Sequence, residues 1–245
     1  MSNVAGGSNP PQHVFIGVPC YDWKVHVQFM ASMLDTFAAC LKAGIAVTVR
    51  TLSGNCHVDD AQNELVAEFL KTDCTDMVII GSDQGWRAGD FVRMCQYDRD
   101  IVAGAVCKKQ KDEAYTILLD QPEIRTDREG LVEAYTVGSG FLRMRRNVLE
   151  TLAEKAVKHD NGVPLIFERI VRGGRRWSGD NVVCLKARDA GFKIWVDPDM
   201  DFEHVGQKVW TGNLKDYWVR VNKEAVRIVD HDRTKKVPPE ITVGA

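Results

Sequence analysis

The sequence predicts an α/β fold, in which one mostly parallel sheet is covered by helices on both faces of a single domain. The first observation is residues 77–80, four apolar residues rich in β-branched types that stop at Gly81, Ser82 and Asp83. A buried parallel strand ends in this way at the edge of its sheet. The second observation is that such runs alternate with helical periodicity up to residue 106. Right-handed crossovers turn this order into one doubly covered sheet.

Composition bounds the kind of protein further. The chain of 245 residues is long enough to bury a sizeable core, and its formal net charge of −2 gives no basic field for nucleic acid or an anionic membrane. Its seven cysteines are scattered and form no C-x-x-C pair, which indicates a reducing compartment. No apolar run approaches the roughly 20 residues of a membrane span, and no signal peptide is evident. We therefore expect a cytoplasmic protein, or one of the host cytoplasm if the source is a phage or virus.

The chain divides into a leader, a domain and a tail. Residues 1–12 are rich in glycine and proline and are expected to be a disordered leader. The domain is expected over 13–206, with halves at 13–106 and 107–206, and a C-terminal helix and flexible tail follow at 207–245. The strands expected in the first half are at 14–18, 45–49, 77–80 and 101–106.

The loop after the first strand contains Pro19, Cys20 and Tyr21. It suits packing against a flat ligand such as a nucleobase, although these residues are also common in turns. The next helix has apolar residues three and four apart, which predicts one continuous face toward the sheet. These residues are Val27, Met30, Leu34, Phe37, Ala38 and Leu41. Gly44 is its expected C-cap.

Two more helices are expected in the first half. One begins at Asp59 or Asp60 as N-cap, and the other covers 89–96. Between them, Asp83 leaves the strand at the carboxyl edge of the sheet, where ligands bind in open α/β folds. Its carboxylate is a candidate for holding a cation, and the alternative is that it caps the helix near Gly89.

The second half is less regular. Residues 107–133 are highly charged and read as an exposed excursion, and residues 172–180 read as a mobile loop rich in arginine. The expected elements are a strand at 134–137, a tight loop at 138–140, helices at 145–158 and 181–190, and a strand at 192–196. A further element of unassigned type lies at 202–206, and an amphipathic helix carries Trp210, Leu214, Tyr217, Trp218 and Val221. The arginines of the loop could meet phosphate, although loop cations are more often solvated.

Asp83, Asp180 and His204 are the residues that could converge on a site. Mg²⁺ or Mn²⁺ acting on a diphosphate needs only one or two protein carboxylates, and an imidazole shifts the preference toward Mn²⁺. Each residue also has a structural alternative. Asp180 could be an N-cap, and His204 could be a structural histidine.

The motifs, in their order, resemble the GT-A class of nucleotide-sugar glycosyltransferases, most closely the small family-2-like enzymes of bacteria, phages and large viruses. The resemblance spans 14–206. Three segments match family motifs with one substitution each: 60–66 (DAQNELV, like "ARN-x-LV" with Gln62 for Arg), 79–83 (IIGSD, like the strand ending in D-x-D with Gly81 for the first Asp) and 179–184 (GDNVVC, like "ED-x-x-F-C" with Gly179 for Glu). Three more segments are similar to the family in order and position: 100–104 (DIVAG), 137–146 (VGSGFLRMRR, like the G-x-G-F segment) and 190–198 followed by His204.

The resemblance implies transfer of a sugar from a nucleotide-diphosphate sugar, UDP- or GDP-linked, to a hydroxyl of a glycan or other acceptor. It implies a divalent metal, Mn²⁺ or Mg²⁺, held by Asp83 and His204, with Asp180 as the general base. It implies that Arg172, Arg175 and Arg176 assist from a closing loop. The substrate-binding residues it implies are Pro19, Cys20, Tyr21, Asn63, Ser82, Gly138, Ser139, Gly140 and Trp177.

Two departures from the family pattern leave alternatives open. Gly81 and Gly179 stand where carboxylates are usual, so a weakened or catalytically inactive module that binds a nucleotide or glycan is the second hypothesis. A nucleotidyltransferase is the third, although the glycine-rich, lysine-containing loop expected after its first strand is replaced here by Pro19, Cys20 and Tyr21.

Overall fold

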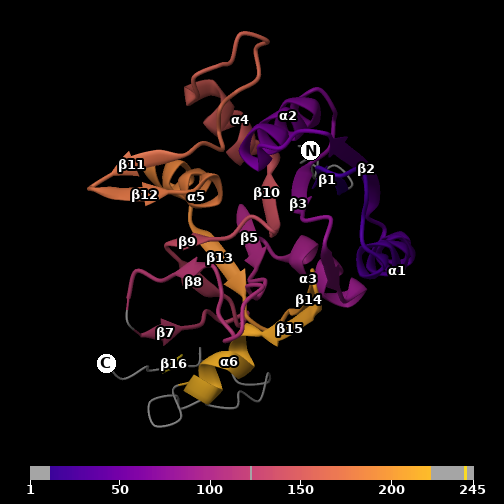
Figure 1. The fold of residues 1–245 in the computed structure, drawn as a ribbon, viewed down its shortest axis with the longest axis vertical. Coiled ribbons are helices and arrows are strands. Elements are labelled where there is room, and N and C mark those ends of the chain that lie inside the picture. Colours follow the sequence, from indigo (N-terminus) through magenta and orange to yellow (C-terminus); the bar gives the residue numbers. More distant parts are fainter. Residues whose placement is uncertain (1–11, 122, 222–239, 242–245) are drawn as a thin grey trace, which may run out of the picture.

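A computed structural model describes residues 12–121, 123–221 and 240–241 of the chain. Its largest element is a seven-stranded sheet with helices on both faces (Figure 1). The helices are α1 (Val27–Ala43), α2 (Val58–Leu70), α3 (Ala88–Gln96), α4 (Arg146–Lys155), α5 (Gly179–Asp189) and α6 (Leu214–Val221). The strands are β1 (His13–Cys20), β2 (Ala46–Ser53), β3 (Asp76–Ile80), β4 (Gln84–Trp86), β5 (Ile101–Gly104), β6 (Ile117–Leu118), β7 (Ile124–Arg125), β8 (Val132–Ala134), β9 (Thr136–Val137), β10 (Phe141–Arg145), β11 (Ile170–Arg172), β12 (Arg175–Trp177), β13 (Ile194–Asp197), β14 (Asp201–Val205), β15 (Val209–Asn213) and β16 (Glu240–Ile241).

The main sheet has the strand order β2-β1-β3-β10-β5-β13-β8. Strands β1, β2, β3, β5 and β13 run in one direction, whereas β10 and β8 run in the opposite direction. The expected α/β class and the mostly parallel sheet are therefore confirmed. A smaller sheet, of order β15-β14-β4, begins where the chain leaves β3.

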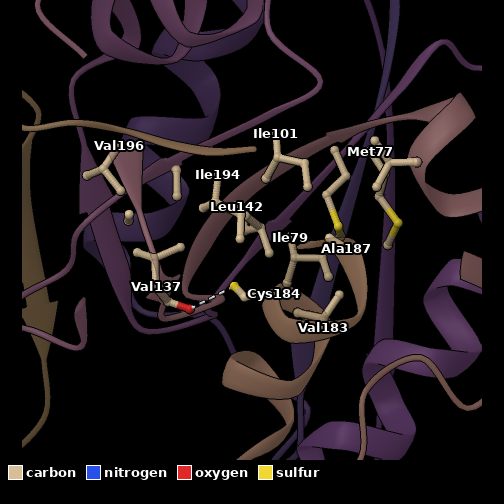
Figure 2. Packing of buried hydrophobic residues seen from close by; sticks show 14 of the residues in the cluster. Met77, Ile79, Ile101, Val137, Leu142, Val183, Cys184, Ala187, Ile194 and Val196 are labelled. Atoms are coloured by element: carbon tan, nitrogen blue, oxygen red, sulfur yellow. Dashed lines mark hydrogen bonds between the residues drawn. The ribbon is translucent and has the colours of Figure 1, made fainter. Parts of the chain in front are cut away.

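The main sheet has an apolar core on each face, because successive side chains of a strand point to opposite sides. In β3, Met77 and Ile79 pack with α2, α4 and α5, whereas Val78 and Ile80 pack with α1 and α3. Figure 2 shows the first core, in which the buried Cys184 thiol of α5 donates to the carbonyl oxygen of Val137. Burial raises the pKa of this thiol to about 12, so it is a neutral packing group.

Helix α1 faces the sheet with the opposite side from the one expected. Its buried residues are Phe29, Met33, Thr36 and Cys40. The apolar row that periodicity selected, Val27, Met30, Leu34, Phe37 and Leu41, is exposed instead, as is Ala38. The expected C-cap is confirmed, because Gly44 is left-handed with φ 71°.

Strand β10 is not among the elements expected from the sequence, in which residues 141–144 have no assignment and a helix begins at about 145. The strand pairs antiparallel with β3 on one side and β5 on the other, at the centre of the sheet. Arg143 is fully buried there, and its Nε donates to Asp76 Oδ1 at 2.7 Å. Its two Nη groups donate to the carbonyl oxygens of Met94, Tyr97 and Arg99. Every nitrogen of the guanidinium is thus hydrogen-bonded, which is what a buried charge requires.

Other expectations need smaller corrections. The arginine-rich loop is the hairpin β11–β12, which projects from the side of the molecule (Figure 1). The N-cap of α2 is His57, so Asp59 and Asp60 lie in the first turn. Trp210 belongs to β15 and precedes the C-terminal helix. The charged segment 107–133 is partly built into the fold, since it contributes β6, β7 and β8.

Some expectations concern residues that are not described. Of the expected leader only residue 12 is described, and in the tail residues 222–239 and 242–245 lie outside the described residues. All seven cysteines are described; they are free thiols, and Cys56 alone among them is exposed. Within the described ranges, no helix is both long and apolar enough to cross a membrane.

Candidate functional site

The candidate site lies at one edge of the main sheet. Strands β1, β3 and β5 end at this edge, and β10 begins there because it runs the opposite way. After β3 the chain turns and enters β4, which leaves the main sheet and pairs with β14. In that pairing His204 is opposite Gln84, and Val205 N donates to the carbonyl oxygen of Asp83 at 2.8 Å.

This pairing brings Asp83 and His204 together from distant parts of the chain. Their Oδ2 and Nε2 atoms are 3.5 Å apart, and the Lys109 ammonium contacts the same carboxylate oxygen. Burial raises the pKa of the Asp83 carboxyl, but hydrogen bonds and charge interactions with His204 and Lys109 outweigh this effect and lower the pKa to about 2. Asp83 is therefore ionised at neutral pH.

The pair has the chemistry to hold a divalent metal. His204 Nδ1 is 2.6 Å from the carbonyl oxygen of Cys107, so this nitrogen carries the proton and donates it. Nε2 is then the ring nitrogen that faces Asp83, and any proton on it would have to leave before its lone pair could bind a metal. One carboxylate oxygen and one imidazole nitrogen fit a Mn²⁺ or Mg²⁺ whose other ligands come from a diphosphate and water. Lys109 would have to release the carboxylate to make room.

The loop at 138–140 fits closely against the turn that carries Asp83. Gly81 N donates to the carbonyl oxygen of Gly140 at 3.0 Å. A Cβ on Gly140 would lie 2.4 Å from the side-chain nitrogen of Gln84, so only glycine fits there. Gln84 is 3% exposed, and its Oε1 has no hydrogen-bond partner among the described residues. The neighbouring Ser139 accepts from Gln62 Nε2 at 2.8 Å.

Asp180 lies at the other end of this loop. It is in the first turn of α5, whose N-cap is Ser178, so Asp180 is not itself the cap. Its Oδ1 accepts from Ser178 Oγ and from the backbone N–H of Asn181. Its Oδ2 is 3.7 Å from where a Cβ on Gly138 would be. The loop at 138–140 therefore connects the surroundings of Asp180 with those of Asp83.

A second carboxylate, that of Asp59, lies beside Gly179, the residue before Asp180. Oδ1 of Asp59, from α2, lies 2.4 Å from where a Cβ on Gly179 would be, and its Oδ2 is 2.8 Å from Arg169 Nε. Asp59 therefore occupies the space that a side chain at position 179 would enter. Position 179 lacks the acidic residue of the pattern that the sequence resembles, but the Asp59 carboxylate lies against this position.

We expect Gly179→Ala to lower the free energy of unfolding by about 1–3 kcal/mol, because the new methyl group must push Asp59 away from Arg169. Adding Asp59→Ala should restore part of that loss, as measured by a double-mutant cycle in urea. The matched control is Gly89→Ala in α3, where a Cβ meets nothing within 4 Å. Additive effects of the two changes would show that the two positions do not compete for space.

A pocket of about 610 Å³ lies at the ends of β1 and β2. Trp23, Gly54, Asn55 and Glu64 are among the residues that line it. Trp23 is 78% exposed and has φ 63°, a backbone conformation that bulky residues rarely adopt and that clusters at ligand sites. The volume falls within the range of small-molecule sites.

The other residues expected to bind substrate differ in whether they are open to a ligand. Tyr21 is exposed, whereas Cys20 is buried and its thiol forms a hydrogen bond with the Ser53 hydroxyl. Ser82 lies in the turn before Asp83, and its carbonyl oxygen accepts from His26 N. Asn63 is 1% exposed and its amide binds the backbone at 166–167, so it has a structural position rather than one open to a ligand.

The projecting hairpin holds the expected aromatic residue and the expected cations. Trp177 lies next to α5, and the Arg175 guanidinium stacks on its ring at 4.3 Å. Arg172 is 3.4 Å from Asp189 of α5. The hairpin therefore contacts the helix that carries Asp180, and the structure does not bring its cations to Asp83.

Sequence reasoning missed Lys109, Gln84, Asp59 and Trp23. Lys109 lies in a segment with many charged residues, and nothing in the sequence distinguishes it as the one that contacts Asp83. Asp59 was interpreted as a helix cap because aspartate is common there. The sequence signal that could have indicated the pocket is Trp23, an aromatic residue in the loop just after the first strand.

No protein-family model and no curated protein matches the chain. Solved structures with some similarity include a Drosophila β1,4-galactosyltransferase 7 mutant in complex with manganese, UDP-Gal and xylobiose, with 12% identity over 85% of this chain and 73% of that chain (TM-score 0.46). S. aureus TarS has 11% identity over 90% and 66% (TM-score 0.44). The T. maritima inositol-1-phosphate CTP transferase has 9% identity over 80% and 90% (TM-score 0.44). At these values the comparisons assign neither a family nor an activity to this chain.

Proposed function

We propose that the protein is a metal-dependent glycosyltransferase that moves a sugar from a nucleotide-diphosphate sugar to an acceptor hydroxyl. The observation that carries this proposal is the meeting of Asp83 and His204 at the ligand-binding edge of the sheet. The order of the motifs, which resembles that of GT-A glycosyltransferases, supports the same assignment.

The donor would span two features of the edge. The nucleoside would lie in the pocket at the ends of β1 and β2, with Trp23, which lines the pocket, as the aromatic surface for the base. Asp83 and His204 would hold Mn²⁺ or Mg²⁺ on the diphosphate. When bound, the metal would supply positive charge that stabilises the departing diphosphate.

The acceptor would lie on the Asp180 side of the loop at 138–140. The Asp180 carboxylate would take the proton of the acceptor hydroxyl while the bond between the sugar carbon and the diphosphate oxygen breaks. Close approach of substrate to this loop is possible because Gly138 and Gly140 carry no side chains. Asp59, held by Arg169, would add a second carboxylate for acceptor hydroxyl groups.

A catalytically inactive nucleotide-binding module is the second candidate, and Lys109 is the observation that favours it. Its ammonium already neutralises the Asp83 oxygen that the metal would need. A permanent ion pair there would leave a fold that binds a nucleotide without metal.

The test is a thermal-shift panel of UDP, GDP, CDP and dTDP, each with Mn²⁺ or with EDTA. One nucleotide at about 100 times its dissociation constant adds about 2.7 kcal/mol, which raises Tm by about 5–10 °C in a domain of this size. We expect that shift only with metal, and we expect Asp83→Ala to abolish it. Asp98→Ala, which removes a carboxylate whose side chain is 89% exposed, should keep it.

Each other outcome decides between the candidates. An equal shift with EDTA and in Asp83→Ala would identify a metal-free binding module. If no nucleotide raises Tm under any condition, the proposed donor site is wrong.

A further inference from the structure

Helix α1 presents a row of large apolar side chains to solvent. We call this row the α1 stripe, and its members with their exposed fractions are Val27 (68%), Met30 (51%), Leu34 (64%), Phe37 (42%) and Leu41 (82%). The helix packs on the sheet through its other side, with Phe29, Met33, Thr36 and Cys40. The core of the chain therefore does not use the α1 stripe.

The spacing of the α1 stripe is that of a helix-packing seam. Its members alternate three and four residues apart, like the a and d positions of a heptad repeat. Two alanines, Ala31 and Ala38, lie beside the row and are exposed as well. None of these seven residues is charged, and the nearest exposed charges on the helix are Asp35 and Lys42, which have opposite signs.

The area is large for a surface that stays in water. At roughly 150 Å² for a full-sized apolar side chain, the exposed part of the α1 stripe is on the order of 450 Å². The largest contiguous apolar patch on a monomeric protein is roughly 300–600 Å², and such a patch is often functional. The estimate is more than half of the roughly 800 Å² that each partner buries in a standard interface.

The α1 stripe is complementary to itself under a two-fold axis through Leu34. In that arrangement Leu34 meets its own copy and Val27 lies opposite Leu41. Met30 lies opposite Ala38, and Phe37 lies opposite Ala31. Large side chains thus face small ones across the axis, which lets two helices interdigitate closely.

We propose that the α1 stripe is a homodimer interface, in which the α1 helices of two copies pack antiparallel across an axis at Leu34. A two-fold contact of this kind uses the same patch on both subunits and closes the assembly at two copies. Helix α1 begins shortly after Trp23, so the antiparallel packing would place the two proposed nucleoside pockets toward opposite ends of the helix pair.

Sedimentation and light scattering at tens of micromolar protein test the assembly. We expect a mass twice the 27.5 kDa of the chain, and we expect Leu34→Glu to halve it, because two buried carboxylates would meet at the axis. Val157→Glu is the matched control, since Val157 is 76% exposed and lies outside α1. Melting curves should show that both variants keep the fold. A monomeric wild type, or a dimer that Leu34→Glu leaves intact, would overturn the proposal.

Cysteine cross-linking tests the antiparallel arrangement in a Cys56→Ser background, which removes the exposed thiol among the described residues. Leu34→Cys should form a disulfide-linked dimer under mild oxidation. Leu41→Cys should not, because the two copies of position 41 lie about 21 Å apart along antiparallel helices, beyond the reach of a disulfide. Equal cross-linking at both positions would indicate parallel helices and contradict the two-fold axis proposed here.

Discussion

Replacing Arg143 with alanine is expected to lower the free energy of unfolding by about 3–5 kcal/mol, enough to unfold much of the protein at 37 °C. The guanidinium lies at the centre of the main sheet with no exposed surface. Its removal would leave Asp76, which is also buried, without its cation, and would leave three backbone carbonyl oxygens without their donors. A cavity of the size of the side chain would add to this cost.

Arg145→Ala is the matched control for this prediction. Arg145 lies two residues further along the same strand and also pairs with an aspartate, Asp98, at 2.9 Å. Because this pair is largely exposed, its loss should cost less than about 1 kcal/mol. Urea unfolding followed by circular dichroism measures both values. Similar losses in the two variants would mean that Arg143 is hydrated in solution and that β10 is not the central strand.

Asp180→Asn is expected to reduce turnover by about 100- to 10,000-fold, the usual contribution of a general base. The amide cannot take the proton of an acceptor hydroxyl or of water, but it keeps nearly the same shape. The measurement is release of the nucleoside diphosphate from the sugar donor whose nucleotide stabilises the protein. Stabilisation by that nucleotide should be unchanged, since Asp180 lies across the 138–140 loop from Asp83.

Asp189→Asn provides the control on the same helix. This carboxylate is 66% exposed and pairs with Arg172 on the hairpin, and we expect its replacement to leave turnover within about twofold. If Asp180→Asn kept full turnover, another group would be the base. If it also lost nucleotide stabilisation, the role of Asp180 would be structural.

The sheet, and the edge of it at which Asp83 lies, could be predicted from the sequence because they depend on local patterns. The run at 77–80 is apolar throughout, and its end fixes where Asp83 leaves the sheet. Helix α1 shows the limit of this reasoning. Periodicity established that one side of α1 is apolar, but not which side faces the sheet, since Thr36 and Cys40 on the buried side are only weakly apolar.

Other features depend on contacts between distant segments. Strand β10 contains a buried arginine whose partners come from β3, α3 and the loop after it, so the five residues alone do not resemble a core strand. The place of Lys109 beside Asp83 and of Asp59 beside Gly179 likewise depends on tertiary packing. The meeting of Asp83 with His204 is predicted by their chemistry as metal ligands and by the family resemblance, and their spacing in the sequence does not predict it.

The pairing of β4 with β14 has a consequence for how the protein is made. Asp83 is translated early, but the strand that supplies His204 and the hydrogen bond from Val205 N follows only after most of the domain has been synthesised. Contacts of such long sequence separation form late, because a large loop must close before they contribute. A nascent chain on the ribosome would therefore form the proposed nucleoside pocket before the two proposed metal ligands, Asp83 and His204, meet. The protein would gain its proposed chemistry only near the end of synthesis.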